Sequence, residues 1–153
     1  MNKIKFFFLK PKVVVIAGQR REKAKEMILR VLSQQLKINK DVFVFKTDDI
    51  SKLSFFIKHS QMPVLVDDEK IKAVNETLKF GFDEKGNDVF ASDIKLNGGI
   101  NFKVNYKGGF VPFWTASLDD TDYEEQIYPV LAAVCVGTVF GLNLVEISEF
   151  LKG

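Results

Sequence analysis

The sequence predicts an α/β fold in which a small parallel sheet with flanking helices is followed by antiparallel β-hairpins and two C-terminal helices. Two observations predict this arrangement. Strand-like and helix-like segments alternate through the first 66 residues, an order typical of a parallel sheet with crossover helices. After Asp67 the apolar period shortens to two, and glycine-rich turns separate short strands.

The first half reads as strand, helix, strand, helix, strand. Residues 13–17 form a continuous apolar, β-branched run that is typical of a strand buried on both faces. Residues 20–37 carry apolar side chains at helical spacing and predict a helix with one buried face. A second strand is expected at 42–45, a second helix after the potential cap at 47–49, and a third strand at 64–66. Right-handed crossovers would then give a Rossmann-like parallel sheet of the kind that carries phosphate loops.

Short strands are expected in the second half, separated by turns with hairpin chemistry. The alternation of Leu78, Phe80 and Phe82 with polar residues or glycine predicts the first of these strands. The others are expected near residues 88–94, 100–106 and 109–114, with turns at 97–99 and 107–109.

The segment 127–145 carries no charged residue and is long enough to cross a bilayer. Gly141, however, is placed like a helix stop, and Asn143 like a new helix cap. We therefore expect two helices packed in a core, at about 123–140 and 144–152, and no membrane span.

Bulk properties fit one globular domain, residues 1–153, in the cytoplasm. The net charge of +2, from 22 basic and 20 acidic residues, gives no support for nucleic-acid binding. The single cysteine, Cys135, excludes an internal disulfide and fits a reducing compartment, and we expect it in the core. The single histidine, His59, is expected at the surface or as a helix cap, and with one cysteine it cannot form a zinc site.

The apolar start of the chain and two acidic runs could each indicate a function, but we interpret them as structural. The apolar start, residues 6–9, is interrupted at once by Lys10-Pro11-Lys12 and is too short for a secretory signal. The acidic runs Asp67-Asp68-Glu69 and Asp119-Asp120 with Asp122 could hold a divalent ion, but loops and helix caps more often explain such runs. We expect no metal and no catalytic residues.

Four segments resemble, in the same order, the central domain of the Mur ligases. They are Thr77 to Glu84 (TLKFGFDE), Asp88 to Ile94 (DVFASDI), Gln126 to Ala133 (QIYPVLAA) and Gly141 to Ile147 (GLNLVEI). Within that family they look closest to the MurF type, which adds D-alanyl-D-alanine. The resemblance implies a link to peptidoglycan synthesis in the cell wall.

Residues 10–18 (KPKVVVIAG) resemble the strand that leads into the phosphate loop of that family, whose pattern is Gly-x-x-Gly-Lys-Thr/Ser. Here the positions read Gly18-Gln19-Arg20-Arg21-Glu22-Lys23, so only the first glycine matches. Arg21 stands at the second glycine, Glu22 at the lysine and Lys23 at the hydroxyl. The resemblance therefore implies a degenerate phosphate loop that binds no nucleotide cofactor.

The resemblance also implies that several parts of a Mur ligase are missing. Only residues 38–76 lie between the loop helix and the hairpins, and the metal-binding acidic residues and modified lysine of the family find no match there. The family's histidine before the helix that Gln126 to Ala133 resembles lines up with Glu125. The outer domains, which hold the UDP-sugar and bring the incoming amino acid, are expected to be absent.

Three functions remain open at this point. The first is a non-catalytic pseudoenzyme that acts as a binding or assembly module. The second is a weak phosphate or nucleotide binder, or a residual ATP-dependent ligase-like enzyme. It would use Gly18, Gln19, Arg20, Arg21 and Lys23 at the helix start, where free N–H groups favour an anion. The third is a decayed gene remnant that still folds.

The chain contains 15 phenylalanines, several in clusters that a narrow sheet would struggle to hide. We expect some of them to form a contact surface for a homodimer or for a protein of cell-wall synthesis. The expected contact is a sheet edge or the region of Phe110, Phe113 and Trp114.

Overall fold

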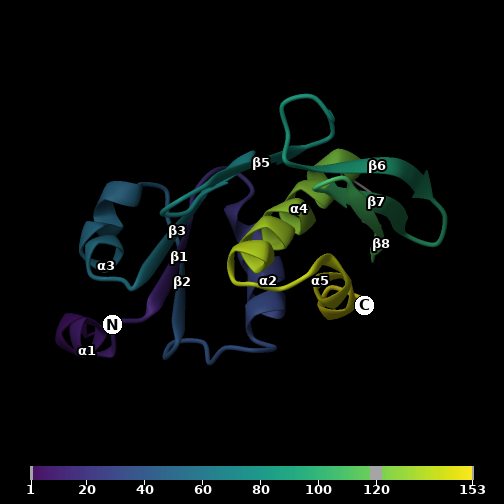
Figure 1. The fold of residues 1–153 in the computed structure, drawn as a ribbon. Coiled ribbons are helices and arrows are strands. Elements are labelled where there is room, and N and C mark those ends of the chain that lie inside the picture. Colours follow the sequence, from purple (N-terminus) through teal and green to yellow (C-terminus); the bar gives the residue numbers. More distant parts are fainter. Residues whose placement is uncertain (1, 118–121, 153) are drawn as a thin grey trace.

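Eight strands form one sheet in the order β2-β1-β3-β4-β5-β6-β7-β8, with helices packed against it (Figure 1). The computed structural model describes residues 2–117 and 122–152. The strands are β1 (Lys12–Ile16), β2 (Val42–Lys46), β3 (Met62–Val66), β4 (Lys70–Lys72), β5 (Thr77–Gly81), β6 (Val89–Leu96), β7 (Ile100–Tyr106) and β8 (Gly109–Thr115). The helices are α1 (Lys3–Leu9), α2 (Arg21–Leu32), the 3-10 helix η1 (Ile50–Leu53), α3 (Ser54–Lys58), α4 (Tyr123–Val139) and α5 (Leu144–Phe150). The α/β fold is confirmed.

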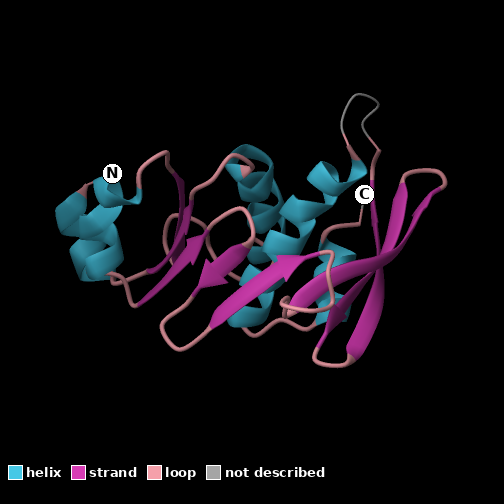
Figure 2. Cartoon of the chain, turned by 90° about the horizontal axis from the view of Figure 1, so that it is seen from above, coloured by secondary structure: helices cyan, strands magenta, loops and turns pink. Residues whose placement is uncertain are grey.

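The parallel half is built on β1, which pairs in parallel with β2 on one side and β3 on the other. Its alternate residues enter two separate cores. Val14 and Ile16 belong to the main core, together with residues of α2 and α4. Val13 and Val15 pack in a second core with Phe6 and Phe43. The prediction of a strand buried on both faces is confirmed, because helices cover both faces of this layer (Figure 2).

The helix α1 was not predicted. The side chain of Asn2 caps its first turn by accepting from the backbone N–H of Ile4 and Lys5. Phe6 is fully buried, with its ring centroid 5.3 Å from that of Phe43 and 4.8 Å from that of Phe56 in α3. Aromatic packing of one residue therefore holds a short helix that its own sequence would barely stabilise.

The strand β4 was also missed, and it makes the two halves one sheet. It pairs antiparallel with β3 and with β5. Only its central residue, Ile71, is buried, and lysines flank it on both sides. Three residues with one apolar position give too weak a signal to predict a strand from the sequence alone.

The second half follows the predicted order. β5 and β6, however, pair in parallel and not as the antiparallel hairpin that was expected. β6, β7 and β8 form two hairpins through the turns at 97–99 and 107–108. The register of β6 shifts between Ser92 and Lys95, where Asp93 has a positive φ of 50°. Such a bulge bends the strand and increases the local twist of the sheet.

The helices α4 and α5 confirm the interpretation of the charge-free segment. Gly141 has a φ of 89°, which ends the first helix, and Asn143 caps the next in a capping box with Glu146. α4 contacts α2 in the first half and β5 and β6 in the second. No helix within the described residues is both long and apolar enough to cross a membrane.

The predicted helix at 20–37 is shorter than expected. α2 ends at Leu32, and the chain then turns back toward β2.

Candidate functional site

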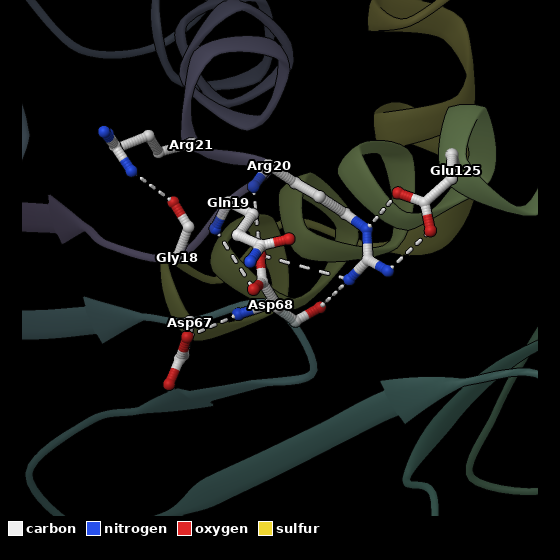
Figure 3. Close-up of polar contacts among 7 residues, drawn as sticks. All are labelled: Gly18, Gln19, Arg20, Arg21, Asp67, Asp68 and Glu125. Carbon is white, nitrogen blue, oxygen red and sulfur yellow. Dashed lines mark hydrogen bonds and ion pairs between the residues drawn. The ribbon is translucent and has the colours of Figure 1, made fainter. Parts of the chain in front are cut away.

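The loop between β1 and α2 lies where the parallel strands β1 and β3 end. The backbone N–H groups of this loop donate to a carboxylate of the chain itself. The side chain of Asp68, in the turn between β3 and β4, accepts a hydrogen bond from the backbone N–H of Gln19 at 3.1 Å and of Arg20 at 3.0 Å (Figure 3). These N–H groups lie at the start of α2, where an anion is favoured. The anion that the structure places there belongs to the chain itself.

Two local features fit this position of Asp68. The carboxylate of Asp67 accepts from the N–H of Asp68 at 2.8 Å and shapes the turn. Gly18 has a φ of 90°, and a Cβ there would lie 2.5 Å from the Asp68 carboxylate. The interpretation of this acidic run as a loop or cap is confirmed, whereas Asp119 and Asp120 lie outside the described residues.

Arg20 is held on three sides. Its Nε and Nη2 donate to the two carboxylate oxygens of Glu125, both at 2.8 Å, and its Nη1 donates to the carbonyl oxygen of Asp68 at 3.3 Å. The guanidinium lies 3.9 Å from the ring centroid of Tyr128. The hydrogen bonds with Glu125 raise the pKa of Arg20 and lower the pKa of Glu125. Burial raises the pKa of the Tyr128 hydroxyl.

The other charged residues of the loop also have partners within the chain. Arg21 donates to the carbonyl oxygen of Gly18 at 2.7 Å. Glu22 pairs with Lys46 on β2 at 2.6 Å, which lowers the pKa of Glu22. Lys23 pairs with Glu26 one turn along α2, at 3.2 Å. The structure thus gathers Gly18, Gln19 and Arg20 around Asp68 and directs Lys23 away, while binding of an external anion stays a prediction.

A pocket of about 490 Å³ lies beside this loop, between α2, the end of β8 and the start of α4. Apolar side chains line much of it, namely Met27, Trp114, Ala116, Pro129 and Leu151. The charged side chains at its wall are three basic and three acidic ones, namely Arg20, Lys23, Arg30, Glu22, Glu26 and Glu125. Its balanced charge does not select one class of ligand.

The three residues of the predicted contact region on β8 differ in their exposure. Phe113 is only 4% exposed and stacks against Phe102, so it belongs to the core and cannot reach a partner. Trp114 is partly buried and donates from Nε1 to the carbonyl oxygen of Gly98 at 2.8 Å. Phe110 is 56% exposed at the start of the strand. The dimer contact stays a prediction, carried by Phe110 and Trp114 rather than Phe113.

The lone cysteine and histidine lie where expected. Cys135 is fully buried in α4, and burial raises the pKa of its thiol well above the ordinary value. His59 caps the C-terminal end of α3, and its ring packs against Phe55, with centroids 4.6 Å apart.

Solved structures share this architecture, although no family model and no curated protein matches the chain. The D-alanyl-D-alanyl-adding ligase of Acinetobacter baumannii superposes with a TM-score of 0.63 at 14% identity, over 98% of this chain and 49% of the ligase. The MurF ligase of Thermotoga maritima in complex with ADP gives 0.64 at 11%, over 96% and 50%. The pseudomurein peptide ligase type C of Methanothermus fervidus gives 0.60 at 13%, over 94% and 49%. The fold is Mur-ligase-like.

This Mur-ligase-like chain spans about half the length of the ligases it matches. Of the residues around the loop, Glu125 was noted only as the replacement for a histidine, and the roles of Asp68 and Tyr128 were missed. Asp68 is the second residue after the last predicted strand of the parallel sheet, which is a position where polar side chains approach the neighbouring loop. That placement was the available signal.

Proposed function

We propose that the chain is a non-catalytic Mur-ligase-like protein that acts as a binding or assembly module in cell-wall synthesis in the cytoplasm. One observation carries the non-catalytic part. The carboxylate of Asp68 accepts from the two N–H groups, of Gln19 and Arg20, that a phosphate would need at this helix start. A nucleotide would have to displace this carboxylate and then lie beside its negative charge.

The charges around the loop do not fit magnesium and a nucleotide either. Nucleotide is the relevant ligand, because one of the similar ligases is described in complex with ADP. Glu22 carries a negative charge where the resembling pattern has its lysine, and it binds Lys46. Arg20 is held by Glu125, and Lys23 by Glu26. We therefore assign no reaction step to this site.

Calorimetry with magnesium–ATP and with ADP tests this proposal. We expect no binding tighter than about 100 μM, which corresponds to roughly 5.5 kcal/mol. We also expect no release of inorganic phosphate from ATP above a protein-free control. Saturable binding tighter than that limit, lost on replacement of Arg20 and Arg21 by alanine, would instead support a nucleotide-binding function.

The binding part of the proposal is a symmetric homodimer. β2 and β8 are the outermost strands of the sheet, and an outer strand offers unpaired N–H and C=O groups to another chain. Phe110 adds an exposed ring at the edge formed by β8. Twofold pairing is the commonest way to cover such a surface.

The link to cell-wall synthesis rests on the fold shared with ligases for peptidoglycan and pseudomurein peptides. Co-purification with an intact Mur ligase of the same cell tests this link.

A further inference from the structure

The helix α1 exposes most of its apolar side chains. Phe8 is 77% exposed, Ile4 69% and Phe7 44%, although Phe6 between them is fully buried. These residues lie near the amino end of β1, away from the loop that follows its carboxyl end (Figure 1). The surface is therefore separate from the candidate site described above.

Packing and hydrogen bonds position this helix on the rest of the fold, with its exposed rings on the outside. Phe6 inserts between Phe43 of β2 and Phe56 of α3. The backbone N–H of Lys10 donates to the carbonyl oxygen of Phe6 at 3.1 Å and closes the helix with a left-handed residue. The ring of Phe7 contacts His59 at the end of α3, with centroids 5.2 Å apart.

Positive charge surrounds the same rings. The first 21 residues contain no aspartate or glutamate, and Glu22 is the first acidic residue of the chain. Lys5, Lys10 and Lys58 are exposed, and none of them enters an ion pair in the part of the chain that the structure describes. These lysines are therefore available to an external anion.

A hollow of about 450 Å³ joins the apolar and basic residues. Its lining is formed by Phe7, Leu9, Lys10, Lys58, His59, Ser60 and Gln61, and contains no carboxylate. An anionic group in this hollow would meet two ammonium groups and an imidazole, while its apolar tail could lie against the rings of α1.

We propose that α1 and this hollow bind the surface of a membrane that contains anionic lipids. The phosphate of a lipid would lie in the hollow beside Lys10 and Lys58, and the side chains of Phe7 and Phe8 would enter the boundary between headgroups and acyl chains. Protein interfaces are depleted in lysine at their centre, so the mixture of lysine and phenylalanine favours a lipid surface over a partner protein. The contact is peripheral and spans nothing.

Sedimentation of the whole chain with lipid vesicles tests the proposal. Vesicles of phosphatidylcholine with phosphatidylglycerol should bind the protein at least about tenfold more strongly than vesicles of phosphatidylcholine alone. The double variant Phe7→Ser with Phe8→Ser and the double variant Lys10→Gln with Lys58→Gln should each lose at least about tenfold of this binding. All four side chains are exposed to a large degree, and circular dichroism checks that the variants fold.

Matched variants remove similar groups elsewhere. Val74→Ser deletes another exposed apolar side chain, and Lys85→Gln with Lys95→Gln deletes two other exposed charges, so these variants should bind as the parent does. Equal binding to both kinds of vesicle, or an equal loss in the matched variants, would overturn the proposal. Release by inorganic phosphate, but not by sodium chloride of equal ionic strength, would show a free-phosphate site instead. Self-association that Phe7→Ser with Phe8→Ser abolishes would assign the surface to a second copy.

Discussion

Arg20 and Glu125 face each other with two parallel hydrogen bonds of 2.8 Å, although 105 residues separate them in the sequence. The pair joins the loop after β1 to the first turn of α4. Tyr128, one turn further along α4, lies under the same guanidinium. The Arg20 side chain therefore attaches the loop after β1 to α4, a helix from the other half of the chain.

Replacing Glu125 by glutamine should therefore destabilise the fold. The bidentate geometry favours a measurable contribution, but the Glu125 side chain is 49% exposed and solvent screens the pair. We expect a loss of about 1 kcal/mol in the free energy of unfolding by urea at neutral pH. Glu124→Gln, on the same helix turn, serves as the matched control and should change the stability by less than half of that amount.

The same pair predicts a dependence on pH. The pKa of Glu125 in the folded chain lies below its ordinary value of 4.5. A carboxyl whose pKa is lowered on folding stabilises the native state above its unfolded pKa, and this contribution is lost as the pH falls through the folded value. The difference in stability between the parent and Glu125→Gln should thus be constant from about pH 7 to about pH 5.5 and shrink below 4.5. A difference that grows in acid would contradict this assignment.

Alanine at Gly18 should cost more than alanine at Gly86. The two glycines have nearly the same φ, 90° and 87°, but a Cβ at Gly18 meets Asp68 and one at Gly86 meets nothing within 4 Å. We expect a loss of about 1 kcal/mol for Gly86→Ala from backbone strain alone, and about 2–4 kcal/mol for Gly18→Ala. Thermal unfolding of both variants isolates the contribution of the contact with Asp68.

Removing the carboxylate of Asp68 should open the loop to external anions. In Asp68→Ala the N–H groups of Gln19 and Arg20 lose their acceptor, and a negative charge leaves the site. We expect inorganic phosphate or sulfate to bind this variant at least about tenfold more tightly than the parent, as seen by calorimetry or by a rise in melting temperature. Glu69→Ala is the control, because it removes a neighbouring exposed charge without freeing those two groups. Equal affinity in Asp68→Ala and Glu69→Ala would show that only net charge matters.

The homodimer predicts a mass of twice the 17.4 kDa chain in light scattering at micromolar concentration. Phe110→Lys should shift the mass toward the monomer, because it places a charge at the centre of the proposed contact. Phe8→Lys, which alters a ring that is 77% exposed near the other end of the sheet, should not. A mass equal to one chain at every concentration would contradict the dimer.

The elements with strong local signals could be predicted from the sequence. The run of β-branched residues in β1 needs no partner to be read as a buried strand, and Gly141 with Asn143 marks a helix end by backbone chemistry alone. α1 and β4 could not be predicted, because each is too short to form by itself. Phe6 holds the first by packing on Phe43, and pairing with β3 and β5 on both sides forms the second.

The site was harder to predict than the fold, for a physical reason. A helix start with free N–H groups indicates an anion, and the sequence does show which residues surround it. The identity of the anion depends on a contact across 48 residues, between Asp68 and Arg20, which no local pattern contains. The acidic run was interpreted as a loop or a helix cap, but the helix start that Asp68 contacts could only be found in three dimensions.

The small number of residues in β4 also has a consequence for how the chain unfolds. Among the described residues, all the strand pairing between the parallel sheet and the hairpins runs through β4, with two paired positions on the β3 side. α4, in contrast, packs against elements of both halves. Neither half can expose α4 without losing part of its own core, so unfolding should be a single cooperative transition. The only tryptophan lies in β8, far along the sheet from β1, and its fluorescence should report the same midpoint as far-ultraviolet circular dichroism of the whole chain.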